Sequence, residues 1–303
     1  MSEKKKVFAT PKIRKFAREL GANIAEVVGT ERAGRITEED VKNYINNKLN
    51  KSSINDEIKI KKEFEHSEFG NVEIIDMPRV KRLAAPHLSN SWNTIPHVTH
   101  HDEADITELE DFRAKLTDSV SGDKIKITPL AFIAKALANN LKKFPRFNSS
   151  IDNISEGKIT LKKYFHIGIA VDTPHGLMVP KIRNVDQMKI KEIAEELKNV
   201  SELSRSLKIN KKEFFGGSIT ITSLGGIGGT YFTPIINYPE VAILGVGRSY
   251  KKQIFIKDKF LARTVLPLSL SYDHRIIDGA EAAKFCNLLK ENLGKNFAYN
   301  LAF

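Results

Sequence analysis

The chain has 303 residues, of which 41% are hydrophobic, enough to bury the core of one large domain and one small domain. No apolar run approaches the roughly 20 residues that span a bilayer, and no apolar segment follows the charged first residues, so we expect neither a membrane span nor a secretory signal. The single cysteine, Cys286, excludes a disulfide within the chain and favours a reducing cytoplasm.

The net charge of +11 raises the question of nucleic-acid binding. Against it, 37 acidic residues are interspersed along the chain, and the sequence carries no nucleic-acid fold signature. The basic excess is local, because residues 1–18 hold seven Lys or Arg against one Glu. This distribution indicates a small basic module with an acidic protein partner rather than nucleic acid.

Residues 7–46 have the pattern of a miniature helical domain, called the docking module below. Thr10 suits an N-cap and Pro11 the first helical position, where the missing N–H costs nothing. We expect a helix over 12–20 and a second short helix that begins at Thr37. About 40 residues is close to the lower limit for folding without disulfides or metal, so most of the module must be committed to packing.

The docking module resembles a known domain. The shared residues are Ala9-Thr10-Pro11, Arg14, Ala17-Arg18-Glu19, Gly21, Gly29-Thr30 and Gly34-Arg35-Ile36. They resemble the peripheral-subunit-binding domain of the dihydrolipoamide acyltransferases, the core components of 2-oxo acid dehydrogenase complexes. The resemblance implies that Arg14, Arg18 and Arg35 dock dihydrolipoamide dehydrogenase or the pyruvate decarboxylase component. Glu31 departs from the family, which commonly has glycine there, so strain or repositioning of this loop is expected.

Residues 47–71 are rich in Lys, Asn, Ser and Glu, and we interpret them as a flexible linker to a catalytic domain over 72–303. The predicted elements of that domain are helix 77–88 (interrupted by Pro86), strand 95–106, helices 108–116 and 128–144, a hairpin of strands 164–171 and 177–182, helix 190–208, strands 218–222 and 240–246, a half-buried strand through 266–272, and helix 280–293.

Two stretches invite hypotheses that we set aside. The first is the cluster of His97, His100, His101 and Asp102, which suggests a metal site. On a strand, His100 and His101 point to opposite faces, so one strand supplies at most two nearby ligands and we expect no metal. The second is the glycine-rich loop over 225–229, which lacks the third glycine of a dinucleotide fingerprint and is not followed by a helix.

The most informative stretch is Ser271-Tyr272-Asp273-His274-Arg275-Ile276-Ile277-Asp278-Gly279. Its histidine follows a strand and precedes a helix, so the imidazole is held by a rigid element yet faces an opening. The pattern resembles the signature of the chloramphenicol-acetyltransferase-like acyltransferases, in the form seen in dihydrolipoamide acyltransferases. The resemblance implies an α/β fold, with a two-layer catalytic domain of this type beside the all-α docking module.

Acyl transfer between thiols needs a base, because a thiol with a pKa near 8.5 is only a few per cent thiolate at neutral pH, and a hydrogen-bond donor for the carbonyl oxygen. Its placement makes His274 the base. By resemblance the donor is the hydroxyl of Thr222, with Ser223 as the neighbouring alternative, since only one of two adjacent strand residues can face the site. Asp278 either orients His274 or fixes the loop through an arginine, and the resemblance favours the second role.

The resemblance also implies substrates and partners. The block from Thr222 to Asn237 looks like that of acetyl-transferring members, so we expect an acetyl group to pass between dihydrolipoamide and coenzyme A in a pyruvate dehydrogenase complex. A succinyl or branched-chain acyl group is the alternative, although no dedicated cation for a succinyl carboxylate is evident. Family members form trimers with the active-site channel between subunits, and the trimers form large cores, here of 24 subunits.

Two other functions are weighed against this one. The docking module argues against a trimeric acetyltransferase of small molecules. The intact His274, Asp278 and Thr222 argue against a non-catalytic scaffold. Family members usually begin with lipoyl domains that carry a lysine within Asp-Lys-Ala, and no such motif precedes Val7. We therefore expect either a fragment or a lipoyl group supplied in trans by another chain.

Overall fold

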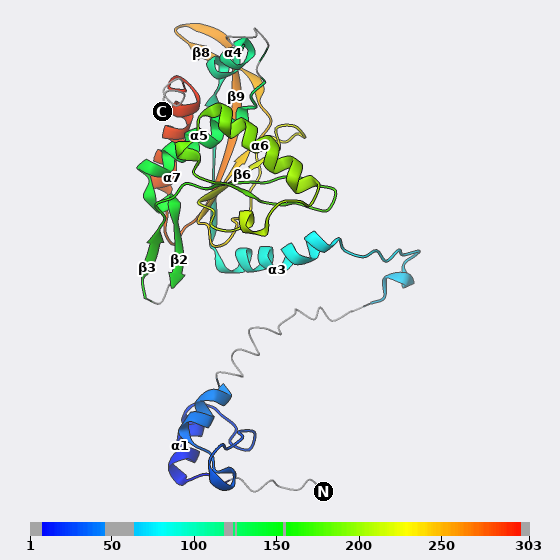
Figure 1. Cartoon of the computed structure of the whole chain (residues 1–303), viewed down its shortest axis with the longest axis vertical. Coiled ribbons are helices and arrows are strands. Elements are labelled where there is room, and N and C mark those ends of the chain that lie inside the picture. The colour runs from blue at the N-terminus through cyan, green and yellow to red at the C-terminus, as the bar shows by residue number, and fades with distance from the viewer. Residues whose placement is uncertain (1–7, 46–63, 118–123, 125, 154–155, 298–303) are drawn as a thin grey trace. The chain divides into compact units, whose positions relative to one another are not determined.

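A computed structural model of the chain describes residues 8–45, 64–117, 124, 126–153 and 156–297 (Figure 1). The chain divides into two compact units, Met1–Ile75 and Asp76–Phe303. Much of the predicted linker lies outside the described residues. Within the described part of the chain, no helix is long and apolar enough to cross a membrane.

The first unit contains the docking module, which begins with helix α1 (Pro11–Glu19). The Thr10 hydroxyl accepts a hydrogen bond from the Ile13 N–H at 3.4 Å, so the predicted N-cap is confirmed. A second helix occupies 38–45, directly after Thr37 as predicted. The buried core of the module is small and consists of Ile13, Ala17, Val27, Ile36 and Val41.

A buried carboxylate joins the loop of the docking module to the second helix. Asp40 accepts hydrogen bonds from the Thr30 hydroxyl at 2.8 Å and from the Thr37 N–H at 2.9 Å. These bonds, led by the one from the Thr37 backbone, lower the pKa of Asp40 to about 2. Glu31 has an extended backbone with φ −78°, so the expectation that it strains the loop is wrong.

The second unit is the α/β domain. Its helices and strands are α3 (Arg79–Thr94), β1 (His97–Asp105), α4 (Thr107–Lys115), α5 (Pro129–Lys143), β2 (Ser149–Asn153), β3 (Lys158–Leu161), β4 (Ile167–Ile169), β5 (Lys181–Ile182), α6 (Ile190–Arg205), β6 (Ile219–Ser223), β7 (Ala242–Val246), β8 (Tyr250–Ile256), β9 (Lys259–Asp273) and α7 (Gly279–Leu293). The predicted helices and strands are present, with ends that differ by a few residues. The largest differences are β9, which begins at Lys259 rather than near Leu266, and α3, which continues through Pro86 to Thr94.

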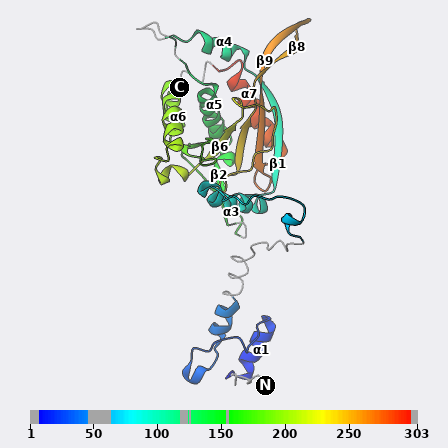
Figure 2. The ribbon, with the colours of Figure 1, turned by 90° about the vertical axis from the view of Figure 1, so that its right-hand side faces the viewer.

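Seven strands form one sheet in the order β1-β9-β7-β6-β4-β5, with β8 paired to β9 outside this path. β4, β6 and β7 run parallel to one another, and β9 runs antiparallel to β7. Helices α5, α6 and α7 lie together on one side of the sheet (Figure 2), and the main hydrophobic core fills the space between them and the strands. The two-layer α/β arrangement predicted from the sequence is confirmed.

The second half of β9, from Val265 to Asp273, is buried on both faces. Its alternate residues from Leu266 to Tyr272 enter the helix-covered core, as the apolar pattern predicts. The intervening Ser269, Ser271 and Asp273 are buried on the opposite face, so the expectation of a half-buried strand is wrong. Polar partners make this burial possible, for example the side-chain hydroxyl of Thr99, which lies 2.8 Å from that of Ser271.

The sequence patterns predict neither of two projecting hairpins. β8 and the first half of β9 leave the body of the domain at one end, and β2 and β3 project at the other (Figure 1). The β8–β9 turn consists of Lys257 and Asp258, with φ of 49° and 62°. Both angles are left-handed, as a two-residue hairpin turn requires, yet neither residue is glycine, and so the usual sequence signal is absent.

Candidate active site

His274 lies in the turn between β9 and α7. Its N–H donates to the Pro96 carbonyl at 3.1 Å, and the carbonyl of Asp273 accepts from the N–H groups of Ile276 and Ile277 at 3.1 and 3.0 Å. These bonds fix the backbone on both sides of the histidine, while its side chain is exposed. An imidazole on a rigid backbone and open to solvent can accept a proton from a bound substrate.

Asp278 caps helix α7. Its carboxylate accepts a hydrogen bond from the Glu281 N–H at 2.8 Å, and this bond is the main reason that the pKa of Asp278 is lowered. Among the described residues, Asp278 bonds neither His274 nor an arginine. Arg146 instead pairs with Glu281 at 3.1 Å. Asp278 therefore holds the turn through the helix cap, which differs from both routes that the sequence suggested.

Thr222 and Ser223 end β6 and lie on opposite faces, as strand alternation predicts. Ile221 packs in the helix-covered core, whereas Thr220 bonds Lys181 and Glu240 on the opposite face, at 3.2 and 2.6 Å. By alternation, the half-buried Thr222 shares the face of Thr220.

Ser223 is exposed on the helix side of the sheet. It lines two hollows of about 370 and 510 Å³. Its hydroxyl accepts a hydrogen bond from the Gly225 N–H at 3.4 Å. The two candidate hydroxyls therefore face different surroundings, and only Ser223 borders the hollows beside α5 and α6.

The strand register separates Thr222 from His274. Thr222 pairs with Gly245 on β7, and Gly245 pairs with Ser269 on β9. His274 follows Ser269 by five positions, which corresponds to about 17 Å along the strand and about 10 Å across two strands. One chain therefore does not bring the two predicted catalytic side chains together.

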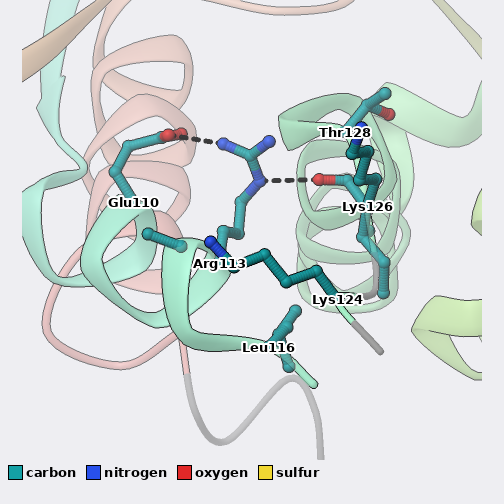
Figure 3. A pocket seen from close by; sticks show the side chains of 8 residues that line it. Glu110, Arg113, Leu116, Lys124, Lys126 and Thr128 are labelled. Atoms are coloured by element: carbon teal, nitrogen blue, oxygen red, sulfur yellow. Dashed lines mark hydrogen bonds and ion pairs between the residues drawn. The ribbon is translucent and has the colours of Figure 1, made fainter. Parts of the chain in front are cut away.

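A run of hollows extends from Ser223 along the helices. The hollow of about 510 Å³ shares Lys126 and Thr128 with a further hollow of about 410 Å³. Figure 3 shows the latter, where Arg113 is paired with Glu110 and donates to the Ile127 carbonyl at 2.8 Å. Further cations line these hollows, namely Lys124, Lys198 and Arg205. No sequence pattern marks these cations, because they come from separate elements.

Another cation lies beside the glycine-rich loop. Arg248 lines a hollow of about 400 Å³ together with Gly228, Gly229, Thr230 and Tyr250. Its N–H donates to the Gly229 carbonyl at 2.9 Å, which fixes the loop against the start of the β8–β9 hairpin. Among the described residues its guanidinium forms no ion pair. No sequence motif singled out Arg248, and the absence of a dedicated cation for a succinyl carboxylate stays a prediction.

Two histidines of β1 bond other residues of the domain, one in a loop and one on β9. His97 Nε2 accepts from the Ile236 N–H at 3.0 Å, and His101 Nδ1 lies 2.9 Å from the Ser269 hydroxyl. Asp102 pairs with Lys290 of α7 at 2.7 Å. No cluster of three or more His, Cys, Asp or Glu side chains suited to a metal occurs among the described residues.

The thiol of Cys286 is fully buried in α7, and burial raises its pKa to about 12. It therefore remains a neutral thiol at neutral pH.

The predicted docking arginines are exposed on the docking module. Arg14 and Arg18 belong to α1, and Arg35 follows the loop. The Arg14 guanidinium donates to the Ala9 carbonyl at 3.2 Å, and that of Arg18 donates to the Arg14 carbonyl at 3.3 Å. Backbone carbonyls within α1 or just before it thus orient both side chains.

Comparison with known proteins decides the family. Residues 69–299 match the 2-oxoacid dehydrogenases acyltransferase family (catalytic domain), and residues 7–42 match the e3 binding domain. The chain belongs to the 2-oxoacid dehydrogenase acyltransferase family. A relative in Cupriavidus necator, the dihydrolipoyllysine-residue acetyltransferase component of pyruvate dehydrogenase complex, is 46% identical over 294 residues, which is 93% of this chain and 53% of that protein. The chain spans about half the length of the curated relatives it matches.

Two solved structures of the family are similar to this chain. One is the cubic core of the pyruvate dehydrogenase multienzyme complex. The other is the dihydrolipoamide acetyltransferase of Azotobacter vinelandii, which addresses the role of a serine, a histidine and an asparagine in the catalytic mechanism. Each has 45% sequence identity and a TM-score of 0.74, and covers 78% of this chain and 96% of its own. The catalytic domain of this chain therefore has the same fold as these two solved structures.

Proposed function

We propose that this chain transfers an acetyl group between dihydrolipoamide and coenzyme A as the core of a pyruvate dehydrogenase complex. One observation carries the proposal. In the Azotobacter vinelandii enzyme the serine precedes the histidine by 52 positions, and the asparagine follows it by four. Here Thr222 precedes His274 by 52 positions, and Asp278 follows it by four. A hydroxyl and a histidine recur at the same spacing, with aspartate in place of asparagine.

The proposed chemistry uses the two side chains in different roles. Neutral His274 takes the proton from the attacking thiol, and the sulfur forms a bond to the thioester carbon. The Thr222 hydroxyl donates a hydrogen bond to the oxygen that becomes negatively charged. The second carbon–sulfur bond then breaks, and His274 returns the proton to the leaving thiolate. The acyl group passes directly between the two thiols, so no covalent enzyme intermediate is needed.

The separation of Thr222 from His274 supports a site shared by two copies. The proposed assembly is a homotrimer in which the Thr222 end of one copy meets the His274 end of another, with the trimers in a 24-subunit core. The cubic core of the similar pyruvate dehydrogenase complex supports a large assembly. Exposed apolar side chains also support it, namely Phe255 and Phe260 on the β8–β9 hairpin and Leu83 and Trp92 on α3.

The run of hollows beginning at Ser223 suits coenzyme A. Phosphate groups can lie near Lys126, Lys198 and Arg205. The thiol-bearing arm can lie between Thr128 and Ser223 and pass the end of β6, where Ser223 is the last residue, to reach the face of Thr222. The test is binding of coenzyme A and of pantetheine, which lacks the nucleotide phosphates. Lys126→Gln should weaken binding of coenzyme A several-fold and leave pantetheine unchanged. Equal effects on both ligands would place the phosphates elsewhere.

The docking module is proposed to bind dihydrolipoamide dehydrogenase or the decarboxylase component through Arg14, Arg18 and Arg35. Binding through exposed charges should weaken as salt is added. Arg14→Ala should weaken it more than Lys15→Ala, a matched change on the same helix. Equal losses or salt-independent binding would contradict docking through these arginines. The dihydrolipoamide substrate is proposed to come from a lipoyl domain outside these residues, on this or another chain.

The deciding experiment for the proposed function is an acyl-transfer assay with free dihydrolipoamide and acetyl-coenzyme A. We expect thioester formation that depends on both thiols and is lost in His274→Ala. A protein that assembles and binds its partners without transferring an acyl group would be a scaffold. Transfer to small-molecule alcohols or amines in preference to dihydrolipoamide would indicate an acetyltransferase of another kind.

A further inference from the structure

An ion pair between a buried carboxylate and a partly exposed arginine flanks the proposed base. Asp273, immediately before His274, is only 2% exposed. Arg275, immediately after it, donates from Nε to Oδ1 at 2.9 Å and to Oδ2 at 3.2 Å, and from its terminal nitrogen to Oδ2 at 2.6 Å. The Arg275 N–H also donates to Oδ1 at 3.0 Å. The two side chains thus close a ring whose backbone contains His274.

Energetics argue against an incidental contact. Removing a carboxylate from water is costly unless charged and hydrogen-bonded partners replace the solvent. Asp273 receives that replacement from one arginine held in two-pronged geometry, which confers orientation as well as charge neutralisation. The ordinary cap of such a turn would need only the Arg275 N–H. The additional guanidinium contacts therefore restrain the turn beyond what forming it requires.

The pair is also tied to the rigid sheet. The Asp273 N–H donates to the Val241 carbonyl at 2.9 Å, just before β7 begins. Val241 follows Glu240, which is 3% exposed and pairs with the buried Lys181 at 2.5 Å. The turn that carries the base is therefore anchored to the middle of the sheet and, through Pro96, to the start of β1.

We propose that Asp273 and Arg275 are positioning residues that hold His274 in its reactive orientation. The inference rests on the proposed role of His274 as the base. Neither residue needs to touch the substrate. The pair restrains the peptide groups on both sides of the histidine, and displacement of a catalytic group by about 1 Å can cost about 100-fold in rate.

Four variants of this chain test the proposal. Arg275→Gln removes the two-pronged contact, and Arg275→Lys keeps the charge without the planar fork. Asp273→Asn keeps an oxygen for the Arg275 N–H. The double variant Asp273→Asn with Arg275→Gln leaves no buried charge, so it serves if Arg275→Gln does not fold. The matched control is Arg183→Gln, because Arg183 pairs with Glu213 at 2.8 Å away from this turn.

The first readout is steady-state acyl transfer by protein confirmed to be folded and assembled. Arg275→Gln and the double variant should lower kcat about 10- to 100-fold with KM nearly unchanged. Arg275→Lys should recover only part of the loss, and Arg183→Gln should retain wild-type kcat. A raised KM at unchanged kcat would make Arg275 a substrate-binding residue and overturn the proposal. A lowered Tm with unchanged kcat would reduce the pair to a structural contact and also overturn it.

The second readout is the reactivity of His274 itself. Diethyl pyrocarbonate acylates neutral imidazole, and mass mapping of the peptide that contains His274 gives its rate without any substrate. The rate should change in Arg275→Gln and stay at the wild-type value in Arg183→Gln. His274→Ala, assayed alongside, separates the two claims. If His274→Ala retains activity, the proposed mechanism is wrong. If His274→Ala is inactive but the Asp273 and Arg275 variants have wild-type kcat, only the positioning role is wrong.

Discussion

The two ends of the sheet differ in how many of their polar and apolar groups find partners within one chain. At the end with His274, the polar groups of the turn are bonded within the chain. The bonds are those of the backbone, the Asp278 cap and the Asp273–Arg275 pair. At the end with Thr222, hollows open beside the strand, and the β8–β9 hairpin exposes apolar side chains. The difference supports the proposal of two half-sites, in which the proposed base His274 is held within one chain and the proposed oxyanion donor Thr222 is completed by a second copy.

Removal of the base should have the largest effect. His274→Ala should lower kcat by at least about 100-fold, because general-base help is worth roughly 10²- to 10⁴-fold. The variant should still assemble, since the exposed side chain adds no core volume. The measurement is acyl transfer together with particle size by light scattering. Turnover above half of the wild-type value would contradict the role of His274 as the base.

Removal of the proposed oxyanion donor should have the next largest effect. Thr222→Ala should lower kcat about 100-fold with little change in coenzyme A affinity, because the hydroxyl acts on charge that develops in the transition state. Ser223→Ala is the matched control on the other face of the strand. If Ser223→Ala has the larger effect, the donor lies on the side of the hollows and the face assignment is wrong.

The preference for one acyl group over another tests the chemistry at the Thr222 end. With acetyl-coenzyme A as donor, kcat/KM should exceed that with succinyl-coenzyme A by at least about tenfold, since an unpaired carboxylate is costly to desolvate. Arg248 is the observation that favours the succinyl alternative. If both donors react equally and Arg248→Gln removes only the succinyl activity, Arg248 pairs with the carboxylate and the assignment to pyruvate is overturned. If acetyl is preferred in both proteins, the assignment stands.

The smallest expected effect concerns the docking module, where Asp40 finds all of its described hydrogen-bond partners within the same chain. The pKa of Asp40 falls from its usual 3.8 to about 2 on folding, so the folded state favours the ionised carboxylate. The stabilisation is present above about pH 4 and is lost as pH falls through about 2. Thermal unfolding of residues 1–50 should therefore show stability decreasing over this range. In Asp40→Asn the decrease should be smaller, and an equal decrease would contradict the account.

The sequence predicts the catalytic turn well and its surroundings less well. Apolar alternation locates β9, and the His274 motif marks the turn after it. Burial of the opposite face was missed, because Ser269 and Ser271 acquire partners only when β1 pairs with β9. The β8–β9 hairpin was missed because its turn uses Lys257 and Asp258 in left-handed conformations. Side chains that converge from separate elements leave no local pattern to detect.

The Asp273–Arg275 pair also could not be predicted from the sequence, although its two residues are close in the chain. Both residues belong to the motif that the sequence analysis singled out, yet their spacing alone does not reveal a buried carboxylate. Asp273 is buried because β1 and β7 flank β9 on both sides, which is a property of the sheet rather than of the turn. Likewise, the distance between Thr222 and His274 follows from strand register, which the sequence does not specify.

Complementation between inactive variants tests the shared site most directly. His274→Ala and Thr222→Ala are unfolded together, mixed in equal amounts and reassembled. If each site takes Thr222 from one copy and His274 from another, random mixing in a symmetric oligomer should restore about one quarter of wild-type activity. Each variant reassembled alone should stay inactive. A mixed assembly no more active than its parents would show that both side chains act within one chain, and would contradict the division into two half-sites.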